Sequence, residues 1–112
     1  MFAMLMGLKS ISPQELHASL GQPALTIIDL NAQNSFMRAR VPGAVNLLPE
    51  FEPSALPANK DGKLVFYCSN PMCLKAPRAA KRAAKLGYTD VRVMAAGIVG
   101  WTDAKLPVDS GA

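Results

Sequence analysis

Two short apolar runs constrain the fold of this chain more than any other feature. Residues 24–30 are rich in β-branched side chains, and residues 64–67 are apolar throughout. Neither run alternates between apolar and polar positions as a half-exposed strand does. Strands that are buried on both faces belong to parallel sheets, where helices cover each side. The two runs therefore predict the inner strands of a mostly parallel sheet.

Helix signals alternate with these strands. Ser12, Pro13 and Glu15 have the positions of an N-cap, a first helical residue and the third residue of a capping box, and this helix ends near Gly21. Further helices are predicted over residues 33–40 and 76–86 and from residue 98, with Pro77 at the first helical position of the second of these. Further strands are predicted near residues 45–47 and 91–94, and the proline-rich segment 49–59 is predicted to be a surface connection. This alternation predicts an α/β fold.

The size of the chain fits one domain. It has 112 residues, of which 50% are hydrophobic and 18% are charged. This composition is typical of a packed globular domain rather than a disordered segment. We expect a single domain over residues 1–112, with a core that covers about residues 11–108.

The start of the chain bears on the location of the protein in the cell. Residues 1–6 are apolar but lack the basic region and long apolar stretch of a signal peptide. We therefore expect a cytoplasmic protein without a membrane span.

The net charge of +4 comes mainly from one predicted helix and has no interleaved aromatic residues, which favours small anions over nucleic acid as partners. The basic residues of this helix are Lys75, Arg78, Lys81, Arg82 and Lys85. For the last three, a solvated helix face without a ligand is an equal alternative.

The two cysteines, Cys68 and Cys73, are too few for a disulfide-stabilised secreted scaffold. They also lack the spacing and the histidine partners of a zinc site, so no metal is expected. We expect both thiols to be reduced and at least one to be used chemically. His17 is the single histidine and lies in the first predicted helix, so we assign it no role, and its position argues against a Cys–His hydrolase mechanism.

Cys68 directly follows the apolar run 64–67, where the segment Ser69-Asn70-Pro71 breaks the strand. In an open α/β sheet this carboxyl edge is where ligands bind, and Asp29 and the turn at residues 95–97 are predicted to share it. The thiol is expected to face solvent near a helix N-terminus, which together with loop N–H groups and cations stabilises thiolates and bound anions. The alternative is a small buried apolar residue. The predicted anion-binding set around the thiol is Ser69, Asn70, Pro71, Met72, Leu74, Lys75 and Arg78.

Cys73 has three interpretations from sequence. It can be a resolving thiol that attacks an oxidised or sulfur-loaded Cys68, a second sulfur carrier, or an inert apolar residue beneath Met72 and Leu74. The nucleophile assignment favours Cys68, because it follows the strand directly and Cys73 does not.

Seven segments in a fixed order make the chain resemble the single-domain rhodaneses, a family of sulfurtransferases. The match spans about residues 11–108. The segments are ISPQEL (11–16), IID (27–29), VPGAVN (41–46), VFYC (65–68), GYTDV (87–91), GIVGW (97–101) and LPV (106–108).

The resemblance implies a three-layer α/β/α fold around a mostly parallel five-stranded sheet. It also implies that Cys68 is the catalytic nucleophile, which takes sulfur from a small anionic donor such as thiosulfate and holds it as a persulfide. The acceptor would be cyanide or a thiol, including a protein thiol, and no cofactor is implied. Asp29 would be a supporting residue.

The chain departs from the family pattern around the nucleophile. Its loop is two residues longer, and Lys75 stands where the closing arginine is usual. Asn31 replaces the arginine that often follows the strand-end aspartate, and Arg40 replaces a histidine before Val41. Because lysine lacks the bidentate fork of arginine, the choice of donor stays open.

Two alternatives therefore remain beside sulfur transfer. One is a cysteine-loop oxyanion reductase, phosphatase-like or thiol redox enzyme that uses Cys68 and Cys73. The other is a non-catalytic rhodanese-like module that binds a partner protein through the longer loop.

Overall fold

The structure is a computed structural model that describes residues 8–111, so the apolar start at residues 1–6 lies outside the described residues. Within them, five parallel strands form one sheet in the order β1-β5-β4-β2-β3. The strands are β1 (Lys9–Ser10), β2 (Leu25–Asp29), β3 (Val45–Asn46), β4 (Lys63–Tyr67) and β5 (Asp90–Val93). The predicted parallel sheet is confirmed, with β4 and β2 among its inner strands.

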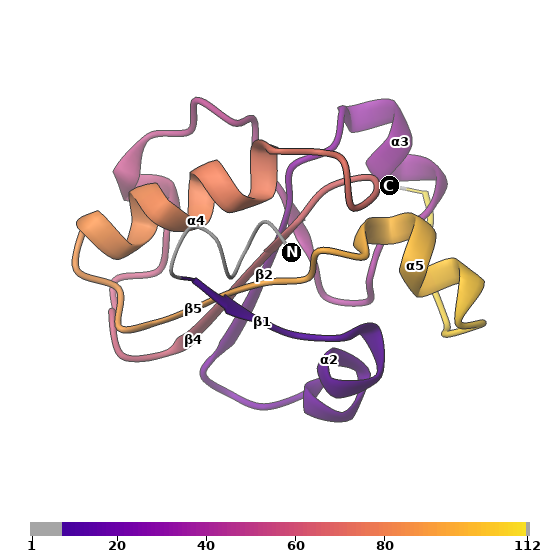
Figure 1. The fold of residues 1–112 in the computed structure, drawn as a ribbon, viewed down its shortest axis with the longest axis horizontal. Coiled ribbons are helices and arrows are strands. Elements are labelled where there is room, and N and C mark those ends of the chain that lie inside the picture. Colours follow the sequence, from indigo (N-terminus) through magenta and orange to yellow (C-terminus); the bar gives the residue numbers. More distant parts are fainter. Residues whose placement is uncertain (1–7, 112) are drawn as a thin grey trace.

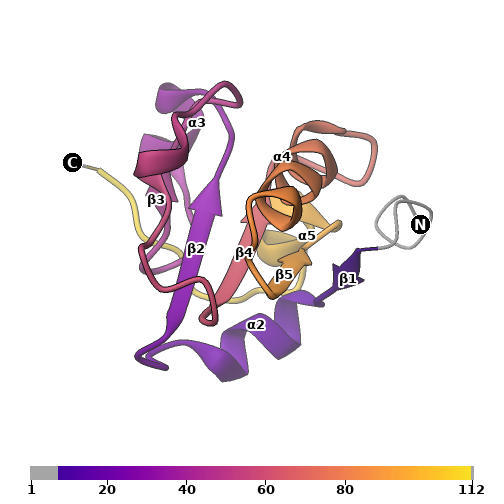
Figure 2. The same ribbon diagram turned by 90° about the vertical axis from the view of Figure 1, so that its left-hand side faces the viewer.

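Helices cover both faces of this sheet, as Figures 1 and 2 show. The α-helices are α2 (Pro13–Ser19), α3 (Gln33–Arg38), α4 (Lys75–Lys85) and α5 (Gly97–Asp103), and a 3-10 turn, η1, covers Pro53–Ala55. One core cluster packs the sheet against α4, and a second packs it against α2 and α5. The three-layer arrangement is confirmed.

The start of α2 follows directly from its sequence. The Ser12 side chain accepts a hydrogen bond from the Glu15 amide, and the Glu15 carboxylate accepts one from the Ser12 amide, at 3.0 and 2.9 Å. This is the predicted capping box. The beginning of α4 differs from the prediction, because the helix starts at Lys75 and Pro77 is its third residue. A proline is tolerated there because the first N–H groups of a helix have no partner within the helix.

The connection between β3 and β4 is more than the surface segment that its prolines predict. Phe51 and Leu56 are each only 6% exposed and pack in the same cluster as α4. Phe51 also stacks on Phe66 of β4, with ring centroids 6.1 Å apart. The prediction is wrong here, because the sheet offers apolar area that α4 alone does not cover.

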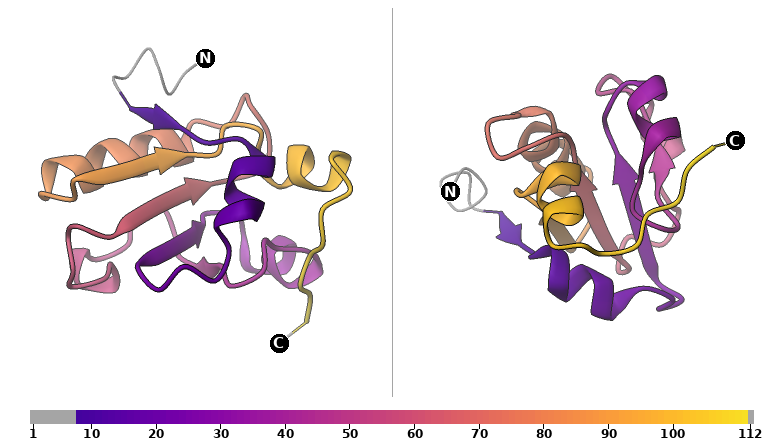
Figure 3. Two further views of the ribbon diagram at one scale, coloured as in Figure 1. Left: turned by 90° about the horizontal axis from the view of Figure 1, so that it is seen from below. Right: turned by 90° about the vertical axis from the view of Figure 1, so that its right-hand side faces the viewer.

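The C-terminal segment after α5 runs back toward α3, as Figure 3 shows. Arg40 and Asp109 form an antiparallel bridge there, with N–H to O distances of 3.0 Å in both directions. Trp101 of α5 is fully buried, and its Nε1 donates to the Pro107 carbonyl at 2.7 Å. Among the described residues, none of the helices has both the length and the apolar character needed to span a membrane.

Candidate active site

Cys68 lies at the carboxyl end of β4, at the position that the sequence predicts. Its carbonyl accepts a hydrogen bond from the Ile98 amide at 2.9 Å, and the Ser69 carbonyl accepts one from the Val99 amide at 3.0 Å. Both donors belong to the first turn of α5, which follows the neighbouring strand β5. Two backbone hydrogen bonds from a helix therefore fix the direction in which the chain leaves the central strand.

The state of the cysteines differs from the prediction. Cys68 is 3% exposed rather than open to solvent, and it forms a disulfide with Cys73. The two Cα atoms are 6.5 Å apart, within the range of about 4.4–6.8 Å that disulfides require. The expectation of two reduced thiols is wrong for this structure, because the loop turns back and brings Cys73 over the end of β4.

The turn that returns Cys73 is centred on residues 70–73. The Cys73 amide donates to the Asn70 carbonyl at 3.1 Å, and the Met72 amide donates to the Asn70 side-chain oxygen at 2.9 Å. The outer part of the loop is open to solvent, with Met72 77% exposed. A local turn therefore shapes the loop, and Asn70 supplies both acceptors.

The beginning of α4 lies just beyond this loop. No side chain caps its N-terminus, where Leu74 has the N-cap position. Among residues 8–111, no acceptor pairs with the amides of Leu74, Lys75 or Ala76. Unpaired N–H groups at a helix N-terminus attract anions, so this part of the loop fits the predicted anion-binding role.

Asp29 is the last residue of β2 and pairs in register with Tyr67, the residue before Cys68. Side chains alternate along a strand, so Asp29 and Tyr67 share the face opposite that of Cys68. Asp29 is fully buried and accepts hydrogen bonds from the Tyr67 hydroxyl at 2.6 Å and the Asn31 amide at 2.7 Å. Burial raises the pKa of Asp29, although both hydrogen bonds oppose this change. Asp29 therefore holds Tyr67, the residue before Cys68, on the opposite face of the sheet.

Asn31 connects this buried carboxylate to the cysteine loop. Its side-chain oxygen accepts a hydrogen bond from the Ser69 hydroxyl at 2.8 Å, and its carbonyl accepts one from the Asn46 side chain at 2.9 Å. Asn31 is 3% exposed, and its Nδ2 has no hydrogen-bond partner within the described part of the chain. A buried polar donor is therefore available beside Ser69.

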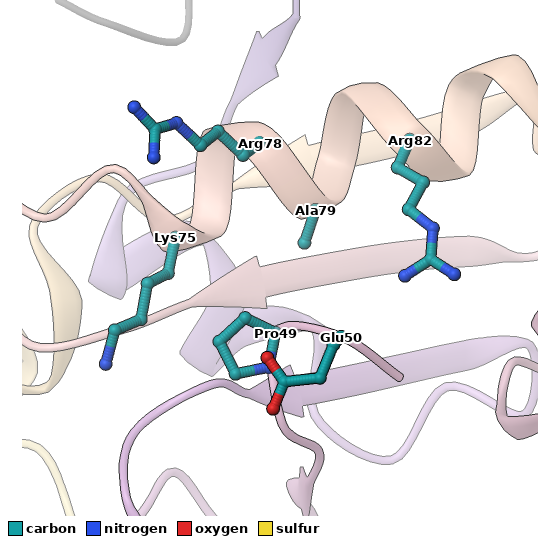
Figure 4. A pocket seen from close by; sticks show the side chains of 6 residues that line it. All are labelled: Pro49, Glu50, Lys75, Arg78, Ala79 and Arg82. Atoms are coloured by element: carbon teal, nitrogen blue, oxygen red, sulfur yellow. The ribbon is translucent and has the colours of Figure 1, made fainter. Parts of the chain in front are cut away.

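The basic side chains of α4 line a shallow groove beside the loop. Figure 4 shows Lys75 and Arg82 extending from α4 toward the segment with Glu50, whereas Arg78 points away. The groove has a volume of about 270 Å³, and its lining does not include Cys68. No ion pair joins Lys75 or Arg78 to an acidic side chain among residues 8–111. The lining residues are Pro49, Glu50, Lys75, Arg78, Ala79 and Arg82.

Residues 8–111 hold no cluster of three or more histidine, cysteine, aspartate or glutamate side chains that could bind a metal ion.

The geometry agrees with a family model. The Rhodanese-like domain model matches residues 12–104 of the chain. The chain belongs to the rhodanese-like domain family. Its rhodanese domain is 30% identical over 89 residues to an HTH-type transcriptional regulator of Mycobacterium tuberculosis, Rv0324; the match covers 79% of this chain but only 39% of the regulator.

Two further proteins are similar to the rhodanese domain, one in sequence and one in both fold and sequence. It is 26% identical over 109 residues to the uncharacterized protein YibN of Escherichia coli, covering 92% of this chain and 73% of YibN. Its fold matches a thiosulfate sulfurtransferase from Pseudomonas aeruginosa with a TM-score of 0.81 and 26% identity, covering 92% of this chain and 19% of that chain.

Three residues of the rhodanese site make contacts that the sequence did not predict. Tyr67 holds Asp29, Asn31 holds Ser69, and Gly97 lies against the loop backbone. Their positions in the sequence could have indicated these contacts, because each residue lies at or just beyond the carboxyl end of a strand, where the predicted site lies.

Proposed function

We propose that this rhodanese domain is a sulfurtransferase that carries sulfane sulfur as a persulfide on Cys68. The observation that carries the proposal is the place of Cys68, which ends the central strand of a rhodanese fold and is fixed there by the Ile98 amide at 2.9 Å. The uncapped start of α4 and the side chain of Lys75, which forms no ion pair within residues 8–111, supply positive potential for an anionic donor.

The loading step needs the dithiol form, because a disulfide sulfur of Cys68 is not a nucleophile. The Cys68 thiolate attacks the outer sulfur of thiosulfate, a Cys68 S–S bond forms, the S–S bond of thiosulfate breaks, and sulfite leaves. The charge is conserved, since thiolate and thiosulfate become persulfide anion and sulfite. An acceptor thiolate, on a small molecule or a protein, then takes the outer sulfur and regenerates the Cys68 thiolate.

The proposal requires the domain to work in a reducing compartment such as the cytoplasm, because disulfides persist in oxidising compartments. Under reducing conditions Cys68 and Cys73 are available as thiols. No cofactor takes part in the proposed cycle.

The test is mass spectrometry of the reduced protein after incubation with thiosulfate. We expect an equivalent of sulfite to be released and, where serine replaces Cys73, one added sulfur atom to stay on the peptide that contains Cys68. Cys68→Ser should take up no sulfur, and Cys73→Ser should still be loaded. An adduct that persists in Cys68→Ser would refute the assignment of the carrier.

The disulfide favours a second candidate, an oxyanion reductase in which Cys73 resolves an intermediate on Cys68. Enzymes of that kind bind a tetrahedral anion, for which a bidentate arginine is the better partner, and Lys75 closes this loop instead. Arsenate reduction that requires both cysteines, without any sulfur adduct from thiosulfate, would support this candidate over sulfur transfer.

A further inference from the structure

The disulfide between Cys68 and Cys73 gives the second cysteine a chemical role that the proposed sulfur transfer does not use. The chain on both sides of the loop is anchored, at Cys68 by the amide of Ile98 and beyond Cys73 by the start of α4. The Asn70 turn between them is closed by hydrogen bonds of 3.1 and 2.9 Å. None of these contacts depends on the bond between the sulfur atoms, so they keep the two thiols close after reduction.

The surroundings of the thiols favour Cys73 over an external thiol as the partner of Cys68. Cys68 is 3% exposed, and Cys73 packs, partly buried, against the same core cluster that contains Cys68. An external thiol has to enter this site and lose its freedom of movement, whereas Cys73 is already positioned. A reaction between groups held on one short loop is faster for this entropic reason.

We propose that Cys73 resolves the Cys68 persulfide and releases its outer sulfur as hydrosulfide, which gives the domain a sulfane-sulfur reductase activity. The inference rests on the proposed function, because the persulfide must first form on Cys68. The disulfide present in the structure is the protein product of this step.

The step is balanced without any further reactant. The Cys73 thiolate attacks Sγ of Cys68, the bond between Sγ and the outer sulfur breaks, and the Cys68–Cys73 bond forms. The persulfide is an anion, so the proton that Cys73 gives up on forming its thiolate goes to the outer sulfur, which leaves as hydrosulfide. Counted as sulfane sulfur, this atom gains two electrons, which the two cysteine sulfurs lose. A dithiol reductant then returns the disulfide to two thiols by thiol–disulfide exchange and is itself oxidised.

The direction of attack distinguishes this activity from sulfur carriage by Cys73. Attack on the outer sulfur would move the persulfide to Cys73 and release no sulfide. Attack on Cys68 Sγ produces the bond that the structure contains. The geometry of the loop therefore accommodates the product of reduction, and the release of sulfide distinguishes the two directions of attack.

The experiment follows one turnover of the reduced, desalted protein with one equivalent of thiosulfate, without air or external thiol. Sulfite reports loading, trapped sulfide reports resolution, and mass spectrometry of unreduced peptides reports the disulfide. We expect the wild type to release sulfite and then sulfide and to end with Cys68 bonded to Cys73. Cys73→Ser and Cys73→Ala should release sulfite, keep the persulfide on Cys68 and release no sulfide.

The two Cys73 variants separate chemistry from packing, because alanine keeps an apolar side chain and serine keeps the size of the thiol. Sulfide release by either variant at the wild-type rate overturns the inference, as does a wild-type persulfide that is stable on Cys68 or found on Cys73. These outcomes leave sulfur transfer intact. No adduct and no sulfite, with thiosulfate or with inorganic polysulfide as donor, would overturn both proposals.

Discussion

The contact between Gly97 and the cysteine loop makes a quantitative prediction. Gly97 has φ +67°, and a Cβ added there would lie 2.5 Å from the carbonyl carbon and oxygen of Ser69 and 2.6 Å from the Asn70 nitrogen. All three atoms are backbone, so rotation of a side chain cannot relieve the overlap. Gly97→Ala must therefore move the start of α5 away from the loop.

The cost has two parts. A left-handed backbone costs an alanine roughly 1–2 kcal/mol. Separation of α5 from the loop breaks the hydrogen bonds to the Cys68 and Ser69 carbonyls, which are 2.9 and 3.0 Å long. Each contributes about 1 kcal/mol net. Gly97→Ala should therefore lower the free energy of unfolding by roughly 3–4 kcal/mol.

Gly21→Ala is the matched control, because Gly21 has φ +89° and a Cβ there would meet no atom within 4 Å. It carries the backbone cost without the overlap, and we expect a loss of roughly 1–2 kcal/mol. Urea denaturation of both variants and the wild type, under one redox condition, measures the difference. If Gly97→Ala loses no more stability than Gly21→Ala, α5 does not hold the loop in the way described.

Two further predictions concern charge. Burial raises the pKa of Asp29 in the folded state, so the stability that this carboxyl group contributes is complete below its unfolded pKa of about 3.9 and is lost as the pH rises through the folded pKa. Urea denaturation across this pH range should show the wild type losing stability relative to Asp29→Asn as the pH rises, and a constant difference would contradict the assignment. Lys75→Ala should raise KM for thiosulfate several-fold at an ionic strength of about 0.15 M, whereas Lys85→Ala, about 15 Å away along α4 and so beyond the Debye length of about 8 Å at that ionic strength, should change it less. Equal effects in steady-state assays would show that the charge of the whole helix, rather than its N-terminus, attracts the donor.

Local signals were sufficient to predict much of the fold. The capping box of Ser12 and Glu15 involves residues three positions apart, and the apolar runs of β2 and β4 identify buried strands without knowledge of their partners. The strand that delivers Cys68 could be recognised for the same reason. The sequence therefore predicts those elements that arise from residues close together in the chain.

The parts that the sequence did not predict depend on distances between segments. A spacing of five positions does not determine the separation of two Cα atoms, so the disulfide of Cys68 and Cys73 required the Asn70 turn to be known. Likewise, Asp29 meets Tyr67 only because β2 and β4 pair in that register. The burial of Phe51 depends on how much of the sheet α4 leaves uncovered.

The alternation of side chains along β4 explains why Cys68, the proposed nucleophile, and Tyr67 are adjacent in sequence but lie on opposite faces of the sheet. Tyr67 donates to Asp29 on one face and accepts from the Val41 amide at 3.1 Å, so it ties the end of β4 to β2 and to the segment before β3. Cys68 then enters the other face, against α4. A shift of one residue in the register of β4 would exchange these faces. The hydrogen bonds of Tyr67 therefore help to fix the side of the sheet on which Cys68 lies, and the proposed reaction of Cys68 with Cys73 requires that side to be the one that α4 covers.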